Sequence, residues 1–374
     1  IVVKTGIATD RDNEDLFGYF VDNNLLISFH DFRNSKRIFQ DVHQNERFCL
    51  LTLGGERTAT DNIEFSFLNT SIEMLHDGDH RMSLTREQIK SINPNTKSIP
   101  TFRSHRNKEI TLKVHRDQPV LVNDEEGTNH WGITYHTMFH LTNDSNLFED
   151  HTRTSLKERG FQLGIDSIFR QGEGEDVYLP LYEGKMIHQF DHRFNTFGDH
   201  SSKEDSPEKR KMTPKEKADT SKEAIPSNWV EKSDFEEEIQ DWGWNADWIF
   251  AFRDVADATT NVRTSVGTIA PFRPFGNTAP LLTFNDEDPE KVTVFTTFFN
   301  SFVFDFALRQ SIGGTHLNKY ILKQLPMPTP EDVEEFTVQT NGMSKSLNDF
   351  LKNRGQKLIW TSDSLDGLGD GLGS

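Results

Sequence analysis

Hydrophobic residues in the first part of the chain follow two different spacings. Across residues 13–24 they recur at helical intervals, which places Leu16, Phe17, Phe20 and Val21 on one predicted helix face. Residues 25–32 and 47–55 contain nearly continuous apolar runs, which predict buried strands. Such strands, separated by a helix, favour an α/β sheet that is covered on both faces. Residues 2–9 predict a strand and a turn, and the sequence starts within this strand. We therefore expect the natural protein to begin further upstream.

After residue 55 the spacing of hydrophobic residues is less regular. Residues 64–69 predict a strand, and residues 83–92 predict a short helix in which Thr85 and Gln88 form a capping box. The string Asn93-Pro94-Asn95 then ends this helix. A long apolar helix is predicted at 292–310, within the segment 289–326, and another helix at 331–352. The polar stretch 199–227, whose charges nearly balance, is expected to be a mobile linker, and the Gly- and Asp-rich end 363–374 to be disordered.

Composition limits what the chain can do. Its 374 residues are 34% hydrophobic and include 30 Phe, which is enough for a real core. No apolar run approaches the roughly 20 residues that a membrane span needs. The single cysteine, Cys49, excludes a disulfide framework and a cysteine-based zinc site, and its apolar neighbours predict a buried thiol. We therefore expect a cytoplasmic protein with no membrane partner.

Charge changes this picture further. The formal net charge is −18, which argues against a general polyanion binder, because phosphate contacts need clustered Lys and Arg. A DNA-reading protein with a local basic face remains compatible with this balance. The segment 102–116 is basic, with five Lys or Arg against one Glu.

Three groups of residues are candidates for chemistry. His188 and His192 have the spacing of zinc ligands on a helix, but Gln189 stands where a metalloprotease has its Glu. We therefore favour a polar loop or a phosphate contact at this string, and we expect no metal. The pair at 313–314 allows a close backbone approach to a phosphate, although a turn between helices is the favoured interpretation.

The third group places Arg near aromatic residues. Arg193, Arg253 and Arg263 have the chemistry to pair with guanine or phosphate, and Gln189, Asn261 and Asn318 have the chemistry to pair with adenine. Structural salt bridges, such as Arg253 with a neighbouring Asp, explain each Arg equally well.

Several long strings resemble the large N-6 adenine DNA methylases of the fused restriction–modification type, which have relatives in phage-defence operons. The strings KTGIATD, LFGYFVDNNLLISFHDFRN and IFQDVHQNERFCLLTL resemble the end of the catalytic domain of that family. NPNTKSIPTFRSHRNKEIT resembles the entry to its target-recognition region. YLPLYEGKMIHQFDHRF, FAFRDVADATTNVRT and NSFVFDFALRQSIGGTHLNKYILKQLP follow in the family's order, so that the resemblance covers about residues 1–330.

The resemblance implies a division of labour. Such enzymes flip an adenine out of the duplex and methylate it with S-adenosylmethionine. The Gly-rich cofactor turn and the Asn/Asp-Pro-Pro-aromatic loop that this chemistry needs do not occur in this sequence. The resemblance therefore implies that an upstream catalytic half or a separate chain supplies them, that this chain alone binds no cofactor, and that its partner is double-stranded DNA.

The resemblance also implies site residues. Phe39 is expected to stack on the flipped adenine, although a core position is an equally good interpretation of it. The residues expected to contact the DNA backbone are Arg103, Arg106, Lys108, Lys185, His188, His192 and Arg193. Those expected at or behind base edges are Gln189, Arg253, Asn261, Arg263, Thr315 and Asn318.

The expected fold class is an α/β remnant of a methyltransferase sheet followed by an α+β target-recognition domain. Residues 1–55 would be the C-terminal strands of a Rossmann-like domain, 56–330 the recognition domain, and 331–374 a helix with a disordered tail. The expected function is the DNA-recognition part of a site-specific adenine methyltransferase, inactive alone. Two alternatives stay open at this point: a non-enzymatic subunit that docks on another protein, which the acidic charge favours, and a metal-dependent nuclease.

Overall fold

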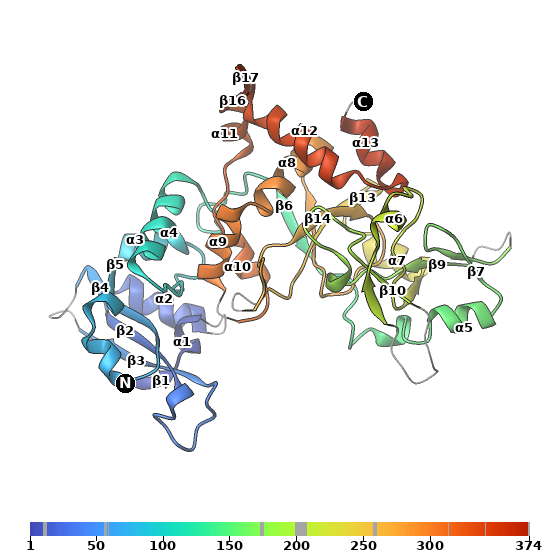
Figure 1. Ribbon diagram of the computed structural model, residues 1–374. Helices are drawn as coiled ribbons and strands as arrows, with labels where there is room; N and C mark the ends of the chain where they lie inside the picture. The colour runs from blue at the N-terminus through green and yellow to red at the C-terminus, as the bar shows by residue number, and fades with distance from the viewer. Residues whose placement is uncertain are drawn as a thin grey trace. The chain divides into compact units, whose positions relative to one another are not determined.

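A computed structural model describes residues 1–372 except 10–12, 56–57, 59, 173–175, 199–207, 257–259, 313 and 341. The fold is mixed α/β with several sheets, and the chain divides into two compact units. Unit 1 comprises Ile1–His130 and Phe306–Thr329, and unit 2 comprises Trp131–Asp305 and Pro330–Ser374. The chain therefore leaves unit 1, builds most of unit 2, and returns (Figure 1).

Unit 1 is built on a five-stranded sheet in the order β1-β3-β2-β4-β5. Its strands are β1 (Val2–Lys4), β2 (Leu26–Arg33), β3 (Arg47–Leu53), β4 (Asn62–Asn69) and β5 (Met82–Thr85). Only the β2–β4 pair is parallel. The strands predicted at 25–32, 47–55 and 64–69 are confirmed. A boundary at residue 55 is wrong, because β4 and β5 complete the same sheet.

The helices that lie wholly in unit 1 are α1 (Gly6–Thr9), α2 (Glu14–Asp22), α3 (Arg86–Ile92), α4 (His105–Asp117) and α10 (Lys319–Lys323). Phe17 and Val21 of α2 and Ile89 of α3 are buried against the apolar face of the sheet, with Phe29 and the thiol of Cys49. The predicted Thr85–Gln88 capping box is present at α3, and Asn93 ends that helix as expected. Local signals thus placed these elements correctly.

Unit 2 contains two four-stranded sheets. The first has the order β14-β13-β15-β6, with β13 (Trp248–Phe252) paired to both β14 (Gly267–Pro271) and β15 (Leu281–Phe284), and β6 (Ile133–His136) at the edge. The second has the order β12-β9-β8-β7, from β7 (Gln162–Leu163), β8 (Phe169–Arg170), β9 (Val177–Pro180) and β12 (Trp229–Glu231). Every residue of β13, β14 and β15 is buried, which explains the aromatic run around Trp248.

Helix α8 (Pro289–Phe299) covers the first sheet, where Phe295 and Phe299 pack on Phe250 with ring centroids 5.2 and 5.1 Å away. The single helix predicted at 292–310 is wrong, since α9 (Phe302–Ser311) is a separate helix. The break occurs because the Asn300 amide nitrogen donates to the carbonyl of Gly267, 2.8 Å away, and the amide oxygen accepts from its N–H. Asn300 thereby ties the helix end to β14.

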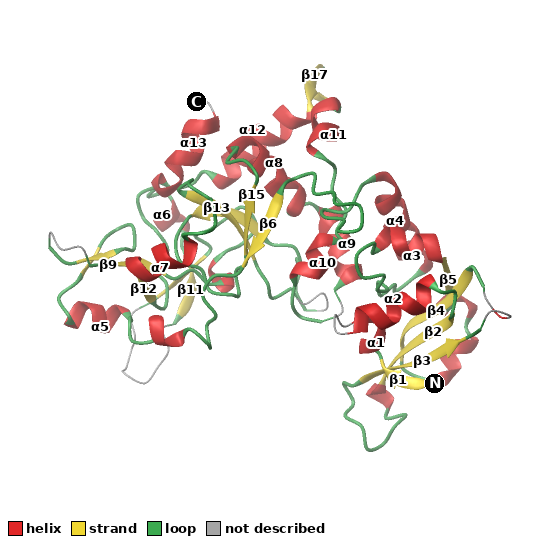
Figure 2. Ribbon diagram, turned by 180° about the vertical axis from the view of Figure 1, so that it is seen from behind, coloured by secondary structure: helices red, strands yellow, loops and turns green. Residues whose placement is uncertain are grey.

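Smaller elements complete unit 2 (Figures 1 and 2). They are α5 (Arg153–Glu158), α6 (Pro214–Lys217), α7 (Lys232–Ile239), α11 (Pro330–Glu335), α12 (Leu347–Ile359), α13 (Asp366–Leu372), and the strand pairs β10 (Asn195–Phe197) with β11 (Lys209–Lys211) and β16 (Thr337–Thr340) with β17 (Met343–Ser346). The helix predicted at 331–352 is wrong, because the β16–β17 hairpin separates α11 from α12.

Two segments expected to lack structure are ordered. Residues 199–207 of the predicted linker lie outside the described residues, but 208–227 contain β11 and α6 and bury Glu223 and Ala224 completely. The predicted tail forms α13, with Leu365 and Leu368 fully buried. Backbone contacts from distant residues stabilise both segments, so composition alone was a poor guide to them.

Candidate nucleic-acid interface

A cluster of basic side chains surrounds Phe194 in unit 2. The Lys211 and Lys217 ammonium groups lie 5.1 and 5.9 Å from the centre of its ring, and the Arg253 guanidinium lies 5.8 Å from it. The His188 ring is tilted against it at 4.4 Å. The electron-rich face of an aromatic ring attracts cations, so Phe194 holds positive charges together that would otherwise repel one another.

Strands β10 and β11 form the outer part of this site. Antiparallel pairing sets Asn195 opposite Lys211 and Phe197 opposite Lys209. A further lysine, Lys185, places its ammonium group 5.0 Å from the Phe197 ring. We call Lys185, His188, Lys209, Lys211, Lys217 and Arg253 the basic cluster.

Local sequence explains why the second half of the cluster folds as it does. Thr213 caps α6 through a capping box with Glu216, and Pro214 occupies the first turn, where its missing N–H costs nothing. Glu216 also accepts two 2.8 Å hydrogen bonds from Arg210. Those hydrogen bonds, first among several causes, hold the pKa of Glu216 far below its ordinary value. Glu216 is thereby fixed as an anion that anchors β11 to α6.

Two lysines of the cluster are paired with carboxylates, and two others have no such partner among the residues that the structure describes. Lys185 pairs with Glu183 at 2.8 Å, and Lys217 pairs with Asp191. Lys209 and Lys211 are exposed, and within the described part of the chain no carboxylate lies at ion-pairing distance from either. Burial lowers the pKa of His188, and the charges of Arg253, Lys211 and Lys217 lower it further against the opposing effect of Asp191. The site is therefore electropositive within an acidic protein.

Arg253 stabilises the backbone of this site through hydrogen bonds. Its Nε donates to the carbonyls of Gly184 and Ile187, each 2.9 Å away, and a second guanidinium nitrogen also donates to Ile187. These bonds fix the 184–187 backbone that carries Lys185 and leads into His188. Arg253 was expected at or behind a base edge, and these bonds place it in a supporting position, while a direct base contact by its other donors stays a prediction.

Two neighbouring residues are also corrected. Arg193 is only 1% exposed, and its guanidinium donates to the carbonyls of Asp219, Lys222 and Lys217 at 3.1, 2.7 and 3.2 Å and to that of Thr361. His192 is fully buried, with its Nε2 atom 3.4 Å from a carboxylate oxygen of Glu223. Neither side chain can reach a DNA phosphate without unfolding this region.

The string HQFDH is a tight turn, in which the His188 N–H donates to the Asp191 carbonyl at 2.7 Å, and it is not part of a helix. Its two His side chains have different environments, one half-buried beside Phe194 and the other buried beside Glu223. In the described ranges, no group of three His, Cys, Asp or Glu side chains is placed to hold a metal ion.

Two further residues expected at base edges are held by backbone carbonyls. The Gln189 amide nitrogen donates to Ser265 at 3.2 Å and to Asn300 at 3.4 Å. The Arg263 guanidinium donates to Asn300 and Ser301 and lies 4.6 Å from the Phe302 ring. Both side chains brace the loop before β14, which agrees with a position behind a base edge, and direct base reading by them stays a prediction. Asn261 lies in the same half-buried loop.

The remaining predicted residues lie in unit 1. Arg103 is exposed just before α4, Arg106 is exposed on that helix, and the Lys108 ammonium donates to the Ser83 carbonyl at 3.3 Å. Phe39 is 41% exposed and packs edge-on against Phe48, with ring centroids 4.9 Å apart. Its stacking on a flipped base stays a prediction.

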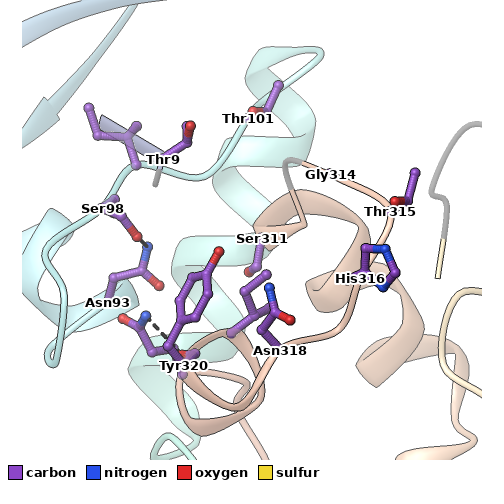
Figure 3. Close-up of a pocket in the computed structure, with 13 residues that line it drawn as sticks. Thr9, Asn93, Ser98, Thr101, Ser311, Gly314, Thr315, His316, Asn318 and Tyr320 are labelled. Atoms are coloured by element: carbon purple, nitrogen blue, oxygen red, sulfur yellow. Dashed lines mark hydrogen bonds between the residues drawn. The ribbon is translucent and has the colours of Figure 1, made fainter. Parts of the chain in front are cut away.

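Thr315 and Asn318 line a cavity of about 200 Å³ within unit 1. Figure 3 shows Tyr320 at its centre, with Asn93 and Ser98 on one side and Ser311 and Asn318 on the other. Gly314 also borders the cavity, whereas residue 313 lies outside the described residues, so the predicted phosphate contact of the pair is open.

Lys209, Lys211 and Lys217 were not among the residues predicted to contact DNA. All three lie in the stretch interpreted as a linker, because its charges nearly balance as a whole. Two local signals were present: the run Lys209-Arg210-Lys211, and the string from Thr213 to Glu216, which has the form of a capping box.

Comparisons with known proteins add little. No family model matches the chain, and no curated protein does. One solved structure that it resembles is described as "Characterization and crystal structure of the type IIG restriction endonuclease BpuSI", with 12% sequence identity and a TM-score of 0.35. The alignment covers 99% of this chain but only 46% of that one, so this chain spans less than half of that protein. Within the described residues, no helix is long and apolar enough to cross a membrane.

Proposed function

We propose that this chain is the DNA-recognition part of a site-specific adenine-N-6 DNA methyltransferase from a restriction–modification or phage-defence system. The observation that carries the proposal is the basic cluster, a local concentration of positive charge in a protein of net charge −18. The resemblance of its sequence strings to the adenine methylases supports the rest. S-adenosylmethionine and the methyl-transfer site would belong to an upstream catalytic half or a separate chain.

The geometry of β11 suits a phosphate backbone. Lys209 and Lys211 are two residues apart on one strand, so their side chains share a face. They are separated by about 6.8 Å along the strand, a distance at which they could contact neighbouring phosphates of one DNA strand. Strand β10 is buried and β11 is exposed, so β11 is the strand of this pair that a DNA backbone could contact.

The test is duplex binding measured by fluorescence anisotropy over a range of salt concentrations. Each phosphate contact contributes about −0.9 to the slope of log K against log salt. The double variant Lys209→Glu/Lys211→Glu should weaken binding and reduce the magnitude of the slope by about 2. Lys345→Glu/Lys357→Glu is the matched control, since both lysines are exposed, on β17 and α12, and the double replacement changes the net charge by the same amount. Equal losses in both proteins would refute a specific role for the cluster.

The acidic surface favours one alternative, a subunit that docks on another protein and does not touch DNA. Helix α7 carries Glu236, Glu237 and Glu238 and is the kind of surface that such a partner would recognise. Capture of a catalytic methyltransferase chain in the absence of DNA, together with duplex binding no stronger than that of the Lys209→Glu/Lys211→Glu protein, would favour docking. DNA cleavage that depends on a divalent metal would instead favour a nuclease.

A further inference from the structure

His188 differs from the other members of the basic cluster, because it is the only one whose charge changes near neutral pH. The ordinary pKa of a histidine is 6.5, whereas lysine and arginine stay protonated far above pH 7. The His188 ring is tilted against the Phe194 ring at 4.4 Å, and its side chain is only half-buried. The protonation state of His188 therefore adjusts the charge of the cluster, and part of its ring is open to solvent.

Permanent positive charges face His188 from three other elements of unit 2. Arg253 lies directly after β13, Lys211 ends β11, and Lys217 ends α6. Their charged groups lie 5.8, 5.1 and 5.9 Å from the centre of the same Phe194 ring. Burial, the largest cause, lowers the pKa of His188, and these three charges lower it further. The protein alone therefore keeps His188 neutral at pH 7.

Asp191 is the acidic residue of the same turn, and its carboxylate raises the pKa of His188 against these effects. That carboxylate is already engaged by other groups. One of its oxygens forms an ion pair with Lys217, and the other accepts a hydrogen bond from the Arg193 N–H at 3.0 Å. An anion from outside the protein would thus supply the negative charge that a protonated imidazole needs at this position.

A DNA phosphate on the cluster would reverse the balance that keeps His188 neutral. Its negative charge favours the protonated ring, and the face of Phe194 attracts an imidazolium as it attracts the Lys211 ammonium. We propose that His188 takes up a proton from the solvent when the phosphate backbone of a duplex binds the basic cluster, so that acidification tightens DNA binding. This inference rests on the proposed function, since it requires that the cluster contacts DNA.

The pH dependence of binding has a defined direction. Binding raises the pKa of His188, so between its free and bound values the complex holds more protons than the free protein. The affinity for DNA therefore rises as the pH falls through that window, by at most about 10-fold per pH unit for one proton. Because the free value lies below 6.5, we expect the affinity to rise about 3–10-fold between about pH 7.5 and about pH 5.5.

The test is duplex binding by the full chain, measured by fluorescence anisotropy at constant salt over the same pH range. His188→Gln keeps a polar side chain that cannot be protonated, so it should lose most of the pH dependence. His76→Gln is the matched control, since His76 is exposed in the turn Ile72–His76 of unit 1 and should keep the pH dependence of the parent. Calorimetry in two buffers that differ in ionisation enthalpy should count about 0.5–1 proton taken up per complex near the ordinary pKa of histidine.

Each outcome separates this inference from the proposed function. A steeper pH dependence in the parent and in His76→Gln than in His188→Gln would support it. Equal pH dependence in all three proteins, or no net proton uptake by the parent, would overturn it and leave DNA recognition intact. Absence of duplex binding at every pH would overturn both together. Proton counting on the parent needs no substitution, so a folding defect in His188→Gln could not hide a negative result.

Discussion

Replacing Arg193 by Lys separates a structural role from a DNA contact, because the substitution keeps the positive charge. Arg193 donates from its planar guanidinium to the carbonyls of residue 217 at the end of α6, of residues 219 and 222 in the segment that follows, and of residue 361 in the C-terminal segment of unit 2. A lysine ammonium carries three donors at a single point and cannot reach carbonyls spread around a guanidinium fork.

The expected loss follows from the carbonyls left unpaired. A hydrogen bond from a charged donor contributes about 1.5–3 kcal/mol, and Lys retains at most about half of the four. We therefore expect Arg193→Lys to lower the free energy of unfolding by about 3–5 kcal/mol. A domain stable by about 5–15 kcal/mol would remain folded under native conditions.

The assay is urea unfolding followed by tryptophan fluorescence. All six tryptophans lie in unit 2, so their emission reports the unit that contains Arg193. With a slope of about 3 kcal/mol per molar urea, the midpoint should fall by roughly 1–1.7 M. Arg210→Lys is the matched control: Arg210 is half-exposed and paired with Glu216, so its loss should stay under about 1 kcal/mol.

The opposite pattern would refute this reasoning. An Arg193→Lys protein with an unchanged urea midpoint would show that its guanidinium does not hold these carbonyls together. If the same protein also showed an altered salt dependence of DNA binding, Arg193 would be a contact to the DNA backbone despite its burial in this structure.

Other predictions test separate parts of the structure. Burial raises the pKa of Glu223, but His192 and Arg273 outweigh it and lower that pKa to about 2. Unit 2 should therefore lose stability as the pH falls from 4.5 towards 2. In an acid titration followed by tryptophan emission, Glu223→Gln should show a smaller dependence of stability on pH. Gly184→Ala would overlap the Thr278 carbonyl and should cost about 1–3 kcal/mol in urea unfolding, with weaker duplex binding. Thr85→Ala removes the α3 cap and should cost unit 1 about 1 kcal/mol, seen as faster thiol labelling of buried Cys49. The purified chain alone should transfer no methyl group to DNA, and tritium incorporation from labelled S-adenosylmethionine would contradict this.

Local patterns predicted the elements of unit 1 well, because the information that forms them lies within a few residues. The helical spacing of Phe17 and Val21 and the cap formed by Thr85 and Gln88 are properties of single segments. The strand partners were beyond reach, since β4 returns beside β2 in parallel and so places residues from both sides of position 55 in one sheet.

The basic cluster was predicted only in part, for a different reason. Lys185, His188 and Arg253 were named individually, but their shared neighbour Phe194 and the pairing of β10 with β11 connect residues far apart in sequence. Arg193 shows the converse error. A buried arginine bonded to carbonyls and an exposed one on a phosphate look identical in a sequence, and only the surrounding backbone distinguishes them.

The prediction of disorder for the C-terminal segment was wrong for a third reason. Its glycines were taken as a sign of disorder, yet Gly369 lies so close to the Trp360 indole that a Cβ there would approach its ring atoms to 2.7 Å. Glycine here permits close packing, which composition cannot distinguish from flexibility.

The alternation of the chain between its two units sets an order of events during synthesis. Leu121 donates its N–H to the Leu325 carbonyl, and Gln324 bonds Thr96, so the early part of unit 1 needs residues that the ribosome adds only after Trp131–Asp305. At a synthesis rate of about 5–20 residues per second, the five-stranded sheet of unit 1 waits roughly 10–35 s for these partners. During that interval it is the part of the protein most exposed to chaperones, and a pause in translation before residue 306 would lengthen its vulnerability.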